Sequence, residues 1–157
     1  ETLAVKLLPA GGSPGMWLAG FYTVRVAFNQ PPHERTTNEL SLSLAPKIDP
    51  EAGIQIERRT RRGGEIYGDL IITIRCIPAV LPEQRVSLLL GDRELIWIKP
   101  EPVIFGQRIQ ELRFRGKEIP PDQYFVRLRV DGVDSLLIDY TQQPPIFNPQ
   151  QKVVLLS

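Results

Sequence analysis

Short stretches in which apolar and polar residues alternate recur along the whole sequence, separated by Pro, Gly, Asn or Asp. Successive side chains of a strand point to opposite faces, so this period of two is typical of half-buried β-strands. No segment keeps a helical period of 3.6 residues. The sequence contains 15 prolines, and an interior proline costs a helix about 3 kcal/mol. The pattern therefore predicts an all-β chain.

Two segments of the chain resemble each other. Residues 22–28 (YTVRVAF) align without gaps on residues 124–130 (YFVRLRV), and a second apolar stretch follows each of them. Asp131-Gly132 after the second copy is a strong hairpin signal, because the tight turn needs positive φ and glycine adopts it freely. The first copy has the longer loop NQPPHERTT in that place. We interpret the repeat as the last hairpin of a sandwich domain, present twice.

The faces of the second copy follow from its alternation. Arg127 and Arg129 are expected on the outer face, away from the core. The residues expected on the core face are Tyr124, Val126, Leu128 and Val130.

The two copies differ in how much chain precedes them. Upstream of Tyr124 there is room for about four or five more strands, enough for an immunoglobulin-like β-sandwich of roughly 100 residues. Upstream of Tyr22 there is room for one. We therefore predict that residues 1–47 are the C-terminal part of a first immunoglobulin-like β-sandwich and that residues 48–157 form a second one. The other strands of the first sandwich are expected either before Glu1 or from another chain.

Charge and reactive residues narrow the classes of function. The net charge is +1, whereas nucleic-acid-binding domains usually carry a strongly basic face. The single cysteine, Cys76, excludes an intrachain disulfide framework and is expected to be a buried thiol. The only histidine, His33, lies far from it in a polar loop, so nothing pairs a nucleophile with a base. We predict no enzyme activity, no cofactor and no metal site.

Two features are candidates for protein contacts. The charge run ERRTRRGGE (57–65) contains Arg58, Arg59, Arg61 and Arg62, and arginine forks can clamp an acidic partner surface. The alternative is a solvated loop between the first two strands of the second domain. Trp97 lies in LIWI (95–98), a stretch without clean alternation. It is either packed in the core or exposed as an interface anchor.

Four stretches, RTTNELSLSLAPKI, PEQRVSLLLGDRE, YFVRLRVDGVDSLLIDY and FNPQQKV, together resemble one protein family. It is the C-terminal immunoglobulin-like region of the cap, or tail terminator, protein of bacterial and in particular cyanobacterial contractile injection systems, which are phage-tail-like. The resemblance covers most of residues 15–157. It implies a structural protein without catalytic residues.

The resemblance also implies partners and a location. Family members assemble as a homo-oligomer, typically a hexameric ring, on the terminal proteins of the sheath and tube. The cap domain that makes those contacts has no counterpart here, so we expect it on a missing N-terminal portion. The implied location is cytoplasmic, with any membrane association indirect and through the assembly. The main alternative is a carbohydrate- or surface-binding immunoglobulin-like module, which an exposed Trp97 beside acids and amides in a groove would favour.

Overall fold

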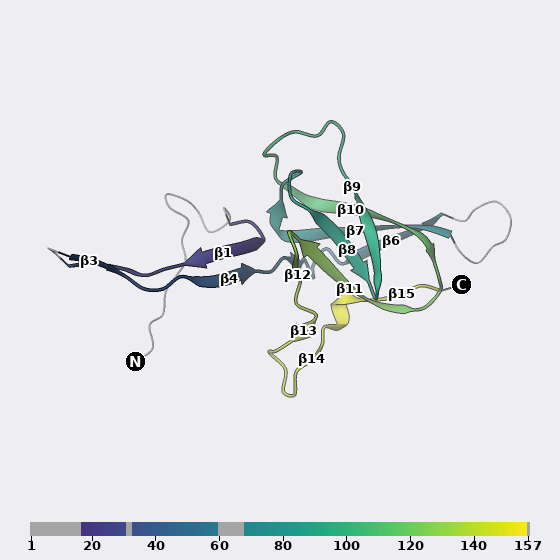
Figure 1. Cartoon of the computed structure of the whole chain (residues 1–157). Coiled ribbons are helices and arrows are strands. Elements are labelled where there is room, and N and C mark those ends of the chain that lie inside the picture. The colour runs from purple at the N-terminus through teal and green to yellow at the C-terminus, as the bar shows by residue number, and fades with distance from the viewer. Residues whose placement is uncertain (1–16, 31–32, 60–67, 157) are drawn as a thin grey trace.

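The computed structural model describes residues 17–30, 33–59 and 68–156, and these residues form an all-β structure (Figure 1). The only helix among them is a short 3-10 turn, η2 (Pro149–Gln151). The strands in chain order are β1 (Gly20–Val24), β2 (Ala27–Gln30), β3 (His33–Thr36), β4 (Leu40–Leu44), β5 (Lys47–Ile48), β6 (Ile54–Arg59), β7 (Gly68–Val80), β8 (Val86–Leu90), β9 (Arg93–Ile98), β10 (Ile109–Ile119), β11 (Gln123–Val130), β12 (Val133–Asp134), β13 (Ile138–Asp139), β14 (Ile146–Phe147) and β15 (Lys152–Val154).

Nine of the strands form one antiparallel sheet that curls on itself into a β-sandwich. One half has the order β6-β7-β10-β9, with β5 also beside β7. The other half has the order β8-β11-β15, with β12 also beside β11. The β8–β9 hairpin, in which Ser87 lies opposite Ile96, joins the two halves. These orders match the A-B-E-D and C-F-G sheets of immunoglobulin-type sandwiches.

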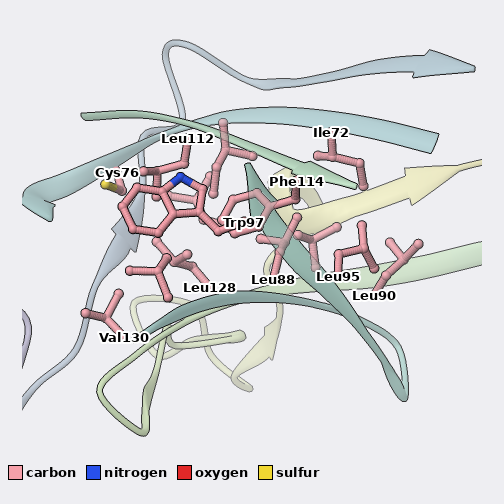
Figure 2. Close-up of a cluster of buried hydrophobic side chains, with 14 of the residues drawn as sticks. Ile72, Cys76, Leu88, Leu90, Leu95, Trp97, Leu112, Phe114, Leu128 and Val130 are labelled. Atoms are coloured by element: carbon pink, nitrogen blue, oxygen red, sulfur yellow. The ribbon is translucent and has the colours of Figure 1, made fainter. Parts of the chain in front are cut away.

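The core lies between the two halves and is apolar (Figure 2). Each strand contributes every second side chain to it, because alternate residues share a face. Burial of one such side chain favours the folded state by about 1.5–3 kcal/mol. The largest fully buried side chains are those of Phe114, Leu70, Ile72, Ile74, Leu88, Leu90, Leu95, Leu112, Leu128, Val80, Val126 and Val130.

Strand β11 and its turn have the predicted geometry. Leu128 is fully buried, as are its alternate neighbours, whereas Arg127 and Arg129 lie half-buried on the opposite face. Asp131 and Gly132 both have positive φ, 49° and 87°, as a tight hairpin turn requires. The face assignment and the turn predicted from the sequence are both confirmed.

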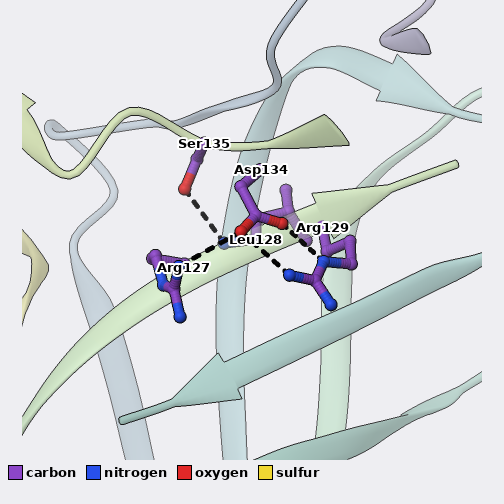
Figure 3. Close-up of polar contacts among 5 residues, drawn as sticks. All are labelled: Arg127, Leu128, Arg129, Asp134 and Ser135. Carbon is purple, nitrogen blue, oxygen red and sulfur yellow. Dashed lines mark hydrogen bonds and ion pairs between the residues drawn. The ribbon is translucent and has the colours of Figure 1, made fainter. Parts of the chain in front are cut away.

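The strand that returns from this turn is shorter than predicted. Within the predicted returning segment, β12 pairs with the end of β11, with Val133 opposite Val130 and Asp134 opposite Arg129. At Ser135 the chain leaves the sheet, and the Ser135 Oγ accepts the hydrogen bond of the Leu128 N–H at 3.0 Å (Figure 3). The hydroxyl thus replaces the carbonyl that a continuing strand would supply. Residues 136–151 then contain the separate pair β13–β14, and β15 rejoins β11 as the predicted last strand.

One hydrogen bond shows the internal repeat in three dimensions. The hydroxyl of Tyr124, near the start of β11, donates to the carbonyl O of Pro120 at 3.1 Å. The hydroxyl of Tyr22, in β1, donates to the carbonyl O of Leu18 at 2.6 Å. Both bonds reach four residues upstream, as in the tyrosine corner that precedes strand F of immunoglobulin-type sandwiches. Strand β1 therefore corresponds to β11.

Strands β1 and β4 form a two-stranded pair outside the sandwich, and β2 and β3 extend it (Figure 1). The loop predicted at 29–37 is therefore partly strand, with Gln30 opposite His33. At the base of this hairpin Ala19 is buried in the sandwich core, and its carbonyl O accepts a hydrogen bond from Gln84 Nε2 at 2.9 Å. The hairpin is the strand pair predicted for the first copy.

The segment between hairpin and sandwich, residues 45–50, had the composition of a stiff extended linker. In the structure it is extended but joined to the sheet: Lys47 lies opposite Ile77, and Ile48 lies opposite Cys76. Pro46 and Ile48 are buried. The segment therefore supplies the first, short edge strand of the sandwich.

Candidate functional site

The arginine run begins at the edge of the sandwich. Arg58 and Arg59 form the end of β6, where they lie opposite Leu70 and Asp69 of β7, and no other described strand pairs with β6. Arg61 and Arg62 fall outside the described residues. The run therefore begins on an edge strand, and its role as a protein contact stays a prediction.

Trp97 is in the core, so its prediction as an exposed candidate for protein contacts is wrong. Its side chain is 8% exposed and belongs to the buried cluster (Figure 2). The Lys99 ammonium lies 5.4 Å from the centre of its ring. The residue on the other face of β9 is Ile96, which is exposed. Buried and exposed residues do alternate along LIWI. The sequence did not show this alternation, because the exposed residue, Ile96, is apolar.

The hairpin of β1 and β4 carries an apolar face. Tyr22 lies opposite Leu42, and Val24 lies opposite Leu40, so these four side chains share one side of the pair. Leu40 is 72% exposed and Leu42 is 39% exposed. We call the side chains of Tyr22, Val24, Leu40, Leu42 and Leu44 the hairpin face.

A second exposed apolar surface lies on the insertion between β12 and β15. The ring of Phe147 anchors the insertion. Its centre lies 4.9 Å from the centre of the Phe125 ring, on the outer face of β11. Exposed apolar patches often mark contact sites. The exposed side chains are Leu136, Ile138, Tyr140, Ile146 and Phe147. The sequence contains no signal that these residues leave the sheet, apart from the Pro144-Pro145 pair.

A groove lies between the insertion and residues 45–50. Its volume is about 760 Å³, and Tyr140, Asn148 and Gln150 are among its lining residues. The side-chain and backbone hydrogen bonds of Thr141 hold the pKa of Asp139, which also lines it, below the usual range. The Oε1 atom of buried Gln151 has no hydrogen-bond partner among the described residues. The groove can therefore accept polar groups, and Lys47 and Asp49 also line it.

An ion-pair cluster lies on the outer face of β11 (Figure 3). The Asp134 carboxylate accepts hydrogen bonds from Arg129 Nε at 2.5 Å and Arg129 Nη2 at 3.0 Å, and from Arg127 Nη1 at 3.2 Å. The hydrogen bond from Arg129 is the main cause that lowers the pKa of Asp134. Partly exposed ion pairs of this kind contribute little to stability, because solvent screens the two charges. The cluster orders the edge of the sheet, and burial of the apolar core provides most of the stability.

Cys76 is a buried thiol, as predicted. Its Sγ lies 3.9 Å from the Ile109 carbonyl O. Burial raises the pKa of the thiol to about 11, because the thiolate would lose its hydration. Nucleophilic and metal-binding cysteines need the thiolate, so Cys76 is not suited to either role. Across the described ranges, no group of three or more His, Cys, Asp or Glu side chains could hold a metal ion.

We expect this thiol to make stability depend on pH in the alkaline range. The unfolded state loses the Cys76 proton near pH 9, whereas the folded state keeps it to about pH 11. Stability is therefore complete below pH 9 and falls as the pH rises to 11, by about 2–3 kcal/mol. Denaturant unfolding at pH 8 and pH 11 measures the loss. In the Cys76→Ala variant this loss should be smaller by the same amount; an equal loss in both proteins would contradict the assignment.

No helix within the described residues is long and apolar enough to cross a membrane.

Comparison with known proteins adds a family but no named relative. No curated protein and no solved structure matches the chain. One family model does match, over residues 46–155, which begins one residue before β5 and ends one residue after β15. It covers the whole sandwich and leaves out the hairpin of β1 and β4. The chain therefore belongs to the family described as domain of unknown function DUF8756.

Proposed function

We propose that this chain is a structural module of the cap, or tail terminator, of a bacterial contractile injection system, without catalytic activity of its own. Its role is to mediate assembly of the cap at the end of the sheath and tube, and to tether the particle. The cap is a homo-oligomer in the cytoplasm, and any membrane contact is made through the assembly. This proposal rests on the sequence resemblance.

The four stretches that carry the resemblance include strands from several parts of the fold. RTTNELSLSLAPKI includes β4 and β5, PEQRVSLLLGDRE includes β8, and the other two include β11 to β13 and β15. Of these strands, β8, β11, β12 and β15 belong to the C-F-G half of the sandwich, whereas β4 lies in the hairpin and β13 pairs with β14. The resemblance therefore includes most of the C-F-G half and is not confined to it.

The single observation that carries an assembly role is the open hairpin. Leucines of the hairpin face are exposed, and β1 pairs only with β4 among the described residues. An uncovered apolar face with free strand edges favours association with other β-structure. A protein that works by assembly has use for such a surface, whereas an isolated binding module does not.

The second candidate, a carbohydrate- or surface-binding module, has less support. It called for an exposed Trp97 beside polar groups in a groove, and Trp97 is buried in the core. The groove beside the insertion offers Tyr140 and Asn148 instead. An aromatic ring and amides can bind sugars, so this groove is where the second candidate would act.

Imaging of particles tests the proposal. In a bacterium that carries the gene beside sheath and tube genes, residues 46–155 are deleted from the gene product. We expect cryo-electron tomograms to show particles whose cap is lost or disordered, or particles detached from their usual site. Particles with caps of unchanged order and position would contradict the structural role.

A second set of variants tests the arginine run within the same assembly. Arg58, Arg59, Arg61 and Arg62 are changed to serine together. The matched control changes four exposed arginines elsewhere on the sandwich to serine: Arg85, Arg93, Arg113 and Arg115. If the run is an interface, cap occupancy should fall for the first variant only. Unchanged occupancy would remove the run from the interface without affecting the proposed role of the chain.

A further inference from the structure

We propose that the groove between the insertion and residues 45–50 binds a neutral saccharide. The Tyr140 ring packs on the C–H face of a sugar ring, and Asn148 and Gln151 form hydrogen bonds with its hydroxyl groups. This inference goes beyond the proposed cap role and does not depend on it, because a structural module can carry a ligand site on its surface.

The groove has the size of a small-ligand site and walls that are held in place. Its volume is about 760 Å³, and pockets for small ligands measure about 300–1,000 Å³. One wall is the insertion, which contains β13, β14 and η2 and projects from the sandwich (Figure 1). The ring contact of Phe147 with Phe125 fixes it to β11. The other wall, residues 45–50, is joined to the sheet through β5.

A buried acceptor without a partner lines the groove. Gln151 is 4% exposed, and its Oε1 accepts no hydrogen bond from the described residues. An unpaired buried acceptor lowers stability, so native proteins normally supply such an atom with a donor from the protein, from water or from a ligand. The described walls of the groove supply none. A hydroxyl group of a ligand in the groove would.

Asn148 provides a donor on the same wall. Its Oδ1 accepts the hydrogen bond of the Gln150 N–H at 3.0 Å, which sets the orientation of the amide and makes Nδ2 the group that can donate to a ligand. Its own backbone N–H donates to the Leu137 carbonyl O at 2.9 Å. The groove therefore offers a donor as well as an acceptor. A sugar hydroxyl, which both donates and accepts, matches this combination.

Asp139 adds further acceptor capacity. The N–H and the hydroxyl of Thr141 both donate to its Oδ1, at 2.9 Å and 2.6 Å. These bonds keep the pKa of Asp139 low, so the carboxylate is ionised at neutral pH. An ionised carboxylate has about four acceptor positions. Asp139 can therefore accept a hydrogen bond from a ligand while it holds the turn at Thr141.

Tyr140 supplies the apolar contact that a sugar ring needs. Its side chain lines the groove and is exposed. Sugar rings carry C–H groups on their faces and hydroxyl groups around their rims, and the electron-rich face of an aromatic ring suits the C–H groups. Apolar residues of the other wall, among them Pro46 and Ile48, also line the groove. The groove thus combines one exposed ring with polar groups beside it.

The charges of the groove disfavour an ionic ligand. The carboxylates of Asp49 and Asp139 line it together with the ammonium group of Lys47. The two carboxylates repel an anion, and Lys47 opposes a cation. In the part of the chain that the structure describes, no three acidic, histidine or cysteine side chains come together to hold a metal ion. A neutral ligand that forms many hydrogen bonds fits these groups best.

The wall at residues 45–50 also disfavours an extended peptide. A peptide that adds as a strand needs a row of backbone donors and acceptors on an edge. Pro46 and Pro50 have no N–H, and Lys47 and Ile48 between them already pair with β7. The polar groups that remain in the groove belong to side chains, which suits a ligand with hydroxyl groups around a ring.

Nuclear magnetic resonance titration of the whole chain tests the inference. The probes are cellotetraose, maltotetraose and the tetramer of N-acetylglucosamine, each added up to about 10 mM. We expect at least one of them to shift the backbone amide signals of residues 139–151 in a saturable way, with a Kd of about 1 mM or lower. The amide signals of β10, which does not line the groove, should stay unchanged.

A matched pair of exposed aromatic residues places the binding in the groove. Tyr140→Ala removes the ring that lines it. Phe105→Ala removes a ring from the loop between β9 and β10, where Phe105 is 87% exposed. Binding of the tetrasaccharide should weaken by about tenfold or more in Tyr140→Ala and stay unchanged in Phe105→Ala.

Gln151→Leu separates a ligand-binding acceptor from a residue that only stabilises the fold. Leucine has a similar volume and removes the unpaired Oε1. We expect binding to weaken by about tenfold or more, while the midpoint of urea unfolding stays the same or rises, because a buried unpaired acceptor is lost. If Gln151→Leu does not fold, Asn148→Asp replaces it. That variant keeps the acceptor for the Gln150 N–H and exchanges only the donor Nδ2 for an oxygen, and its binding should weaken as well.

Several results would overturn the inference. These are the absence of saturable shifts with all three tetrasaccharides, equal binding by Tyr140→Ala and Phe105→Ala, or unchanged binding by Gln151→Leu, which would leave Oε1 to an ordered water. Saturable shifts of the same signals with spermidine or with a decaproline peptide, and with none of the sugars, would assign the groove to a cation or a peptide. The particle-imaging test of the cap role uses a different readout, so the two proposals fail separately.

Discussion

Replacing Leu128 with alanine should lower the free energy of unfolding of the sandwich by about 2–5 kcal/mol. Leu128 is fully buried in β11, between Val126 and Val130 on the core face, and belongs to the main core cluster (Figure 2). Truncation removes apolar contacts and leaves a cavity that the neighbouring strands cannot close. Chemical denaturation monitored by circular dichroism measures the difference.

Two controls separate burial from other causes. Leu136→Ala removes the same atoms from an exposed position on the insertion, and we expect a change within about 0.5 kcal/mol. Arg129→Ala removes a partly exposed ion pair with Asp134, and we expect a much smaller loss of stability than in Leu128→Ala, because solvent screens such a pair. If Leu128→Ala and Arg129→Ala destabilised the protein equally, the assignment of faces on β11 would be wrong.

Much of the sandwich could be predicted because local pattern and burial agree in it. The alternation in 124–130 and the Asp131-Gly132 turn each depend on adjacent residues, and both are confirmed. The all-β class followed from the same pattern and from the prolines. Pairing between strands far apart in the sequence, such as β7 with β10 and β8 with β11, could not be predicted from one sequence, because many partners satisfy a period of two.

The end of the second copy was predicted less well, for a local reason. The residues of DSLLIDY look like one continuous strand. In the structure Ser135 substitutes its hydroxyl for a strand carbonyl at the Leu128 N–H, and the chain leaves the sheet. Serine competes for backbone hydrogen bonds in this way wherever the chain permits it. Whether the chain continues as a strand after Ser135 or leaves the sheet depends on where β15 later pairs with β11. The local sequence does not contain that information.

The candidate site shows the same division. The open hairpin was predicted, because an internal repeat allowed one copy to be compared with a fuller one. Trp97 was ambiguous because Ile96 beside it is apolar yet exposed. The sequence did contain a signal for the shared tyrosine corner, because Tyr22 and Tyr124 align in the repeat. Only the structure gives the two carbonyl partners, at Leu18 and Pro120.

Replacing Gly116 with valine should destabilise the sandwich by more than about 3 kcal/mol. Gly116 is buried in β10, next to the point where its register with β7 shifts. A Cβ atom there would lie 2.9 Å from Ile119 Cγ1 and 3.1 Å from Leu95 Cγ. Both neighbours are core side chains, so the extra carbons of valine would push two strands apart. Gly116→Ala adds only the first carbon and should cost about 1–3 kcal/mol.

Lys117→Val is the matched control for that substitution. It introduces the same side chain at the next position of β10, which is exposed, and β-branched residues suit strands. We expect its stability to stay within about 0.5 kcal/mol of the unchanged protein. Thermal unfolding of the three variants should then rank them as Lys117→Val, Gly116→Ala and Gly116→Val, in order of falling stability. A Gly116→Val variant as stable as Lys117→Val would mean that the core beside Leu95 and Ile119 has free space, and that β10 packs less closely on β9 than the distances around Gly116 require.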